Sequence, residues 1–190
     1  MRKPIIVLNG VHGAGKTTLA TLLEQRNDRY QRFPEIGAML RQEVGMNALS
    51  SDERFDTEVI RRETVRDSIL FATQKIPLVE TWHIGNLAYV STRSPRLLAS
   101  YEKCFPQFLS LFDPLAIFIT IPWNTFAQRA TEKIEPEQRQ ELQRFYECIQ
   151  HVIEASYARF HIPFFRIENG PGNLEANAKL IEDFLSNRGL

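Results

Sequence analysis

The chain has 190 residues, of which 43% are hydrophobic, and its 23 Lys and Arg residues balance 23 Asp and Glu residues. This length fits one domain with a full apolar core, and the neutral balance excludes the broad basic field that attracts nucleic acids and anionic membranes. We therefore expect a single domain over residues 1–190 that binds small anionic molecules in preference to nucleic acid, and no membrane partner.

The cysteines and the N-terminal residues indicate the compartment. Cys104 and Cys148 have neither the C-x-x-C spacing of a zinc site nor a disulfide framework, and such isolated thiols are typical of a reduced, cytosolic protein. The apolar run at residues 5–8 is too short for a signal peptide or a membrane span. Both observations predict a cytoplasmic protein.

Short apolar runs recur along the chain, separated by helical patterns. We predict strands at residues 5–9, 78–80, 115–121 and 164–168, with a weaker candidate at 30–33. Nearly continuous apolar strands that alternate with helices are typical of a parallel sheet covered on both faces. The expected fold is a three-layer, doubly wound α/β domain, in which ligands bind at the carboxyl ends of the strands.

The first predicted strand leads into a phosphate-binding pattern. Residues 10–17 read G-x-x-x-x-G-K-T, and a helical run follows at residues 18–24. Glycines let successive backbone N–H groups turn toward phosphate oxygens, Lys16 contacts the β- and γ-phosphates, and the Thr17 hydroxyl can bind Mg²⁺. The predicted nucleotide site comprises Gly10, His12, Gly13, Ala14, Gly15, Lys16, Thr17 and Thr18.

Residues 34–75 contain more helix than a strand crossover requires, so we expect them to form a second pocket that binds an acceptor molecule. Ser50 and Glu53 have the spacing of a capping box. Near one face of the following helix lie Phe55, Val59, Val65, Ile69 and Ala72, and the opposite face carries Arg61, Arg62 and Arg66. A solvated face with glutamate partners is an equal alternative for these arginines.

The third predicted strand ends in an acid. The carboxylate of Glu80 should lie beside the phosphate loop, where it can hold Mg²⁺ through water or take a proton from an attacking hydroxyl. Capping of the next helix is the alternative. Arg93 and Arg96 follow closely enough to reach the same cleft, although a surface position fits them as well.

Residues 123–144 carry cations on both sides of a predicted helix break. Arg129 and Lys133 lie one turn apart, Pro136 interrupts the helix, and Arg139 and Arg144 follow. Such cations suit a movable lid that the charge of bound phosphates orders, with Arg129 near the transferring group. Solvated surface is the simpler alternative. The loop at residues 169–172 should also reach the ligand edge of the sheet, near an adenine.

These motifs together resemble the nucleoside monophosphate kinase-like P-loop NTPases, and thymidylate kinases in particular. Thymidylate kinases carry D-R-Y-x-x-S-x-x-A-Y after the third strand, and residues 80–89 read E-T-W-H-I-G-N-L-A-Y. The resemblance implies that Glu35 and Arg61 line the acceptor pocket, with Trp82 and Tyr89 beside the base. Thr81 replaces the family's arginine, and the Glu at position 80 also resembles the E-R-S stretch of deoxynucleoside kinases.

We therefore predict a kinase that uses ATP and Mg²⁺ to phosphorylate a nucleotide or nucleoside. The predicted catalytic residues are Lys16, Glu80 and Arg129; the metal ligands are Thr17 and Glu80; the acceptor contacts are Glu35, Arg61, Trp82, Tyr89 and Arg93; and the lid cations include Lys133 and Arg139. One alternative is a regulatory module or slow NTPase without an acceptor, because a phosphate loop alone predicts binding and not transfer. A polynucleotide-end kinase is another alternative, and a homodimer is possible.

Overall fold

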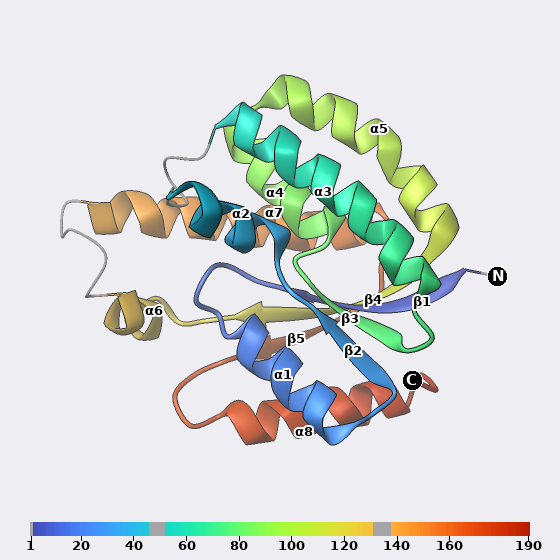
Figure 1. Cartoon of the computed structure of the whole chain (residues 1–190). Helices are drawn as coiled ribbons and strands as arrows, with labels where there is room; N and C mark the ends of the chain where they lie inside the picture. Colours follow the sequence, from blue (N-terminus) through green and yellow to red (C-terminus); the bar gives the residue numbers. More distant parts are fainter. Residues whose placement is uncertain (1, 46–51, 131–137) are drawn as a thin grey trace.

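In the computed structural model, residues 2–45, 52–130 and 138–190 are described, and within them five parallel strands form one sheet in the order β2-β3-β1-β4-β5 (Figure 1). The strands are β1 (Lys3–Asn9), β2 (Tyr30–Phe33), β3 (Ile76–Glu80), β4 (Phe112–Thr120) and β5 (Phe164–Glu168). Central β1 pairs with both neighbours, so that Ile6 lies opposite Leu78 on one side and Leu115 on the other. The predicted doubly wound parallel sheet is confirmed, and three strands begin earlier than expected.

Helices cover both faces of this sheet (Figure 1). On one face lie α1 (Lys16–Arg26) and α8 (Leu174–Ser186), and on the other lie α3 (Glu53–Ala72), α4 (His83–Arg93), α5 (Pro95–Leu111) and α7 (Arg139–Arg159). Two shorter helices, α2 (Ile36–Val44) and α6 (Trp123–Ala130), lie near the carboxyl ends of the strands. The sheet is thus the middle of three layers.

The hydrophobic core follows from the sequence of β1. Its four consecutive apolar residues, Ile5 to Leu8, are at most 1% exposed, because helices cover both sides of the strand. Burying one such side chain contributes about 1.5–3 kcal/mol to stability. The core therefore fixes β1 at the centre of the sheet and, with it, the position of the loop that follows.

Helix α3 departs from the prediction in its second half, whereas Phe55 and Val59 are buried as expected. Val65 and Ile69, which we expected to pack inward, are 57% and 56% exposed, whereas Arg66, expected on the outer face, is buried. The buried face instead combines apolar with charged residues: Phe55, Asp56, Val59, Glu63, Arg66, Asp67 and Leu70. The apolar pattern misled because the inner face of α3 packs partly against ionic partners. The observed N-cap is Asp52, whose side chain accepts from Phe55 N at 2.9 Å, and Ser50 lies outside the described residues.

Candidate functional site

The phosphate-binding pattern forms a tight loop between β1 and α1. Gly15, directly before α1, has a left-handed backbone with φ 92°, which favours glycine. A Cβ atom there would lie 2.2 Å from Asn169 Nδ2, and Asn169 itself donates to Ala14 O at 2.7 Å. The loop after β5 is therefore packed directly against the phosphate loop, as the sequence predicts from its position at the carboxyl end of the sheet.

The Lys16 ammonium lies beneath this loop and is 5% exposed. Its Nζ donates to Gly10 O at 3.0 Å and Val11 O at 3.2 Å, and it lies 3.1 Å from Glu35 Oε2. A bound phosphate would have to exchange with these oxygens for the ammonium. The Lys16 ammonium is thus present in the loop, but protein oxygens already bind it.

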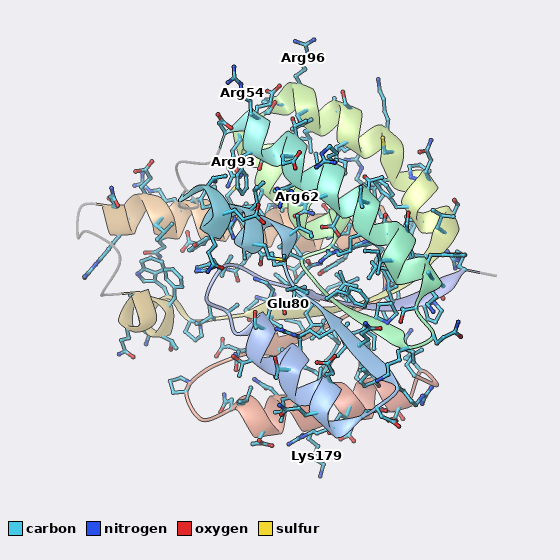
Figure 2. All side chains as sticks on the ribbon, in the orientation of Figure 1. Arg54, Arg62, Glu80, Arg93, Arg96 and Lys179 are labelled. Carbon is cyan, nitrogen blue, oxygen red and sulfur yellow. The ribbon has the colours of Figure 1, made fainter. Side chains whose placement is uncertain are left out.

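Glu80 lies beside Thr17 in the middle of the molecule (Figure 2), because the parallel register places it opposite Leu8 at the end of β1. The Thr17 hydroxyl donates to Glu80 Oε2 at 2.5 Å, and Arg32 Nη1 lies 3.3 Å from Oε1. Burial raises the pKa of Glu80, since the hydrogen bond and nearby cations offset the loss of solvation incompletely. A further positive charge nearby would therefore stabilise the ionised carboxylate.

Glu35 precedes α2 and is 6% exposed. Its Oε1 lies 2.9 Å from Arg41 Nη2, and its Oε2 accepts from the Thr81 hydroxyl at 3.1 Å in addition to its contact with Lys16. Burial alone would raise the pKa of Glu35, but Lys16 and Arg41 lower it to about 2 by their charges and hydrogen bonds. Glu35 is consequently a permanent anion near neutral pH.

Thr81, which stands where thymidylate kinases have an arginine, has a left-handed backbone with φ 48°. Such strain persists where several contacts hold the residue. Its N–H donates to Leu8 O at 3.0 Å, its hydroxyl to Glu35, and its carbonyl accepts from Arg66 at 3.3 Å. Arg66 also donates to Pro34 O at 2.5 Å, so it ties together the ends of β2 and β3.

A cavity of about 610 Å³ connects these parts. Its lining includes the phosphate loop, Glu35 and Glu80, Asn169 with the loop after β5, and Ala38 and Met39 of α2. The same cavity is thus lined by the phosphate loop, by both carboxylates and by α2. This arrangement fits a site in which a group passes between two substrates.

Two residues that the resemblance assigned to the acceptor lie elsewhere. The side chain of Arg61 is 64% exposed and pairs with Glu58 at 2.7 Å on the outer surface of α3. Trp82 is 0% exposed, packs edge to face against Phe112, and donates from Nε1 to Asp67 at 3.1 Å. Trp82 is a core residue in this structure, and neither side chain lines the 610 Å³ cavity.

Tyr89 and Arg93 of α4 lie close to α3 and α7, where both approach the ring of Phe145. Arg93 Nη1 lies 2.5 Å from Asp56 Oδ1, and its guanidinium carbon stands 5.5 Å from the centre of the Tyr89 ring. Arg96, by contrast, is exposed and extends from α5 at the outer surface (Figure 2). No helical spacing indicated Arg41 or Asp56, because Arg41 pairs with Glu35, which precedes α2, and Asp56 pairs with Arg93 of another helix.

The predicted lid falls largely on residues that the structure leaves out. Lys133 and Pro136 lie outside the described residues, as does the side chain of Arg129, although its backbone belongs to α6. Arg139 begins α7 and its side chain is partly buried. The lid and the role of Arg129 stay predictions.

Solved structures resemble this fold, although no protein-family model and no curated protein matches the sequence. Thymidylate kinase from Candida albicans has a TM-score of 0.66 at 14% identity, over 99% of this chain and 93% of that one. Deoxyadenosine kinase from M. mycoides, with the products dCMP and dCDP bound, has a TM-score of 0.64 at 14% identity, over 96% and 98%. NadR in complex with NR has 0.63 at 15% identity over 96% of this chain, which spans 50% of the NadR chain.

These likenesses, with the strand order 2-3-1-4-5, show a P-loop fold of the nucleoside monophosphate kinase-like type. Its solved neighbours include both nucleotide and nucleoside kinases. Across the described residues, no helix has the length and apolarity needed to cross a membrane.

Proposed function

We propose that this protein is a kinase that transfers the γ-phosphoryl group of ATP to a nucleoside or nucleotide. The observation that carries the proposal is the 610 Å³ cavity, which extends from the phosphate loop past two buried glutamates to α2. An enzyme that only hydrolyses nucleotide needs space for water beyond the γ-phosphate. A cavity that continues to α2 suits a second substrate.

The phosphate loop would bind the ATP phosphates through its backbone N–H groups and Lys16. The Lys16 ammonium would leave the carbonyl oxygens of Gly10 and Val11 and the carboxylate of Glu35 for the phosphate oxygens. Catalysis of phosphoryl transfer consists mainly of positioning and charge stabilisation, and these residues supply both. The predicted lid cations Arg129, Lys133 and Arg139 would add positive charge to the transferring group.

Thr17 and Glu80 fit a Mg²⁺ site. Their side-chain oxygens are 2.5 Å apart and both are hard ligands, and because burial raises the pKa of Glu80, a cation beside its carboxylate would stabilise the ionised form. The described residues contain no group of three or more acidic, His or Cys side chains that could hold a metal alone, which agrees with the way Mg²⁺ binds largely through water and substrate phosphates. When bound, Mg²⁺ would neutralise charge on the β- and γ-phosphates.

Glu35 would orient the acceptor. Arg41 and Thr81 fix its carboxylate, and a pKa of about 2 keeps it ionised, so it can accept a hydrogen bond from a hydroxyl group. Release of Lys16 to the phosphates would free Oε2 for that contact. Glu80 would then serve the metal, and Glu35 the attacking group.

The test is phosphate transfer from γ-labelled ATP in the presence of Mg²⁺ and a panel of nucleosides and nucleoside monophosphates. Labelled acceptor supports the kinase. Labelled inorganic phosphate alone, formed at a rate that no acceptor changes, would instead favour a slow NTPase or a regulatory module.

A further inference from the structure

A small cavity of about 10 Å³ lies beside the large one, enclosed by α2, α3 and α4. Glu35 lines both cavities and stands between them at the start of α2. The polar side chains that line the small cavity are Glu35, Arg41, Asp56, Asn86, Tyr89 and Arg93. A displacement of α2 away from α3 and α4 would therefore join the two cavities.

The charges around the small cavity cancel in pairs. Arg41 lies 2.9 Å from Glu35, and Arg93 lies 2.5 Å from Asp56, with all four side chains at most 11% exposed. Lys16, the cation of the large cavity, also contacts Glu35. A phosphate dianion placed here would compete with buried carboxylates for their cations and leave those carboxylates uncompensated, which is costly. Arg61, which the resemblance assigned to the acceptor, points to the outer surface.

Two residues that line this cavity each carry a buried polar atom without a hydrogen-bond partner in the described structure. The atoms are Asp56 Oδ2 and the Tyr89 hydroxyl, and both residues are buried, at 3% and 6% exposure. Buried polar groups are normally hydrogen-bonded, so an unpaired acceptor and an unpaired hydroxyl on residues that line one cavity need an explanation. A ligand that donates to Asp56 and accepts from Tyr89 would supply it, as the N–H and carbonyl groups of a base or the hydroxyls of a sugar can.

We propose, on the basis of the kinase function above, that the phosphoryl acceptor is an uncharged nucleoside and not a nucleoside monophosphate. Asp56 and Tyr89 contact its polar groups once α2 has moved. Glu35 faces its reacting hydroxyl. The ion pairs Arg41–Glu35 and Arg93–Asp56 hold the carboxylates in place and keep the pocket neutral.

The first test compares the common ribo- and deoxyribonucleosides with their 5′-monophosphates as acceptors for γ-labelled ATP and Mg²⁺. We expect at least one nucleoside to be phosphorylated with a kcat/KM at least tenfold above that of its monophosphate. A monophosphate that is the better acceptor would overturn this inference and leave the kinase function standing. If no compound of either series is phosphorylated, both proposals fail.

A second test uses Tyr89→Phe with Tyr30→Phe as a control, because Tyr30 is also buried, at 2% against 6%, but begins β2 at the opposite end of that strand from the site. One lost hydrogen bond to the ligand should raise the KM for the nucleoside about threefold to tenfold, with kcat little changed. The thermal midpoint should not fall, because the Tyr89 hydroxyl has no protein partner in the described structure. An unchanged KM in Tyr89→Phe would refute the contact.

Discussion

Two buried glutamates at neighbouring strand ends face opposite electrostatic surroundings. Glu35, after β2, lies between Lys16 and Arg41, and its pKa is lowered to about 2 despite burial. Glu80, at the end of β3, has a hydroxyl and the partly exposed Arg32 as direct partners, and burial raises its pKa. The neighbouring charges therefore distinguish the two carboxylates. Cations fully offset the burial of Glu35, whereas the cations near Glu80 offset its burial only in part.

The largest effect is expected when the Lys16 ammonium, which lies in the phosphate loop and contacts Glu35, is removed. Lys16→Ala should lower kcat by about 10³ or more, because the phosphates lose their point charge. The fold should remain, since Arg41 still neutralises Glu35. Lys179→Ala, on the exposed surface of α8 (Figure 2), is the matched control and should keep wild-type turnover. Wild-type phosphoryl transfer by purified Lys16→Ala would contradict the proposed mechanism.

Glu35→Gln should destabilise the protein at neutral pH. A pKa lowered from 4.5 to about 2 corresponds to a contribution of roughly 3 kcal/mol, which is present above the unfolded pKa and is lost as the pH falls through the folded one. Urea unfolding of the wild type and Glu35→Gln between pH 2 and pH 7 measures this difference, which should be largest at neutral pH and smallest at pH 2. The exposed pair Glu154–Arg166 offers a control, and Glu154→Gln should change stability by less than about 0.5 kcal/mol. Equal effects of both substitutions would refute the electrostatic account of Glu35.

The two halves of the site also differ in what the sequence can predict. The phosphate loop is contiguous, and the parallel register places Glu80 beside it, so the motif and the strand pattern suffice. The acceptor side depends on ion pairs between separate elements, such as Arg93 with Asp56, for which no local pattern exists. The apolar face of α3 was therefore misassigned, and buried Arg66 was expected on the outside. Propensity and periodicity describe one element at a time, whereas these charges are buried only because of their tertiary partners.

Glu80→Gln should change the free energy of unfolding in the opposite direction to Glu35→Gln. Because its folded pKa is raised, the carboxylate costs stability above its unfolded pKa, so the uncharged variant should be more stable at neutral pH and gain nothing at low pH. Turnover should nevertheless fall by about 10²-fold if Glu80 serves the metal or a proton. Half-maximal activity should also require more Mg²⁺. If Glu80→Gln leaves the Mg²⁺ dependence unchanged, Glu80 has no part in the metal site.

The smallest expected effect concerns ADP affinity and separates the two glutamates most clearly. In Glu35→Gln, Lys16 loses a competing carboxylate 3.1 Å away, so ADP should bind about threefold to tenfold more tightly even though phosphoryl transfer is impaired. Calorimetric titration with ADP and Mg²⁺ measures this directly. Glu80→Gln should show the reverse, with weaker binding, because Thr17 and the metal lose their carboxylate partner. If both variants bind ADP more weakly than the wild type, Glu35 does not compete with ADP for Lys16. The proposed difference in role between Glu35 and Glu80 in nucleotide binding would then be wrong.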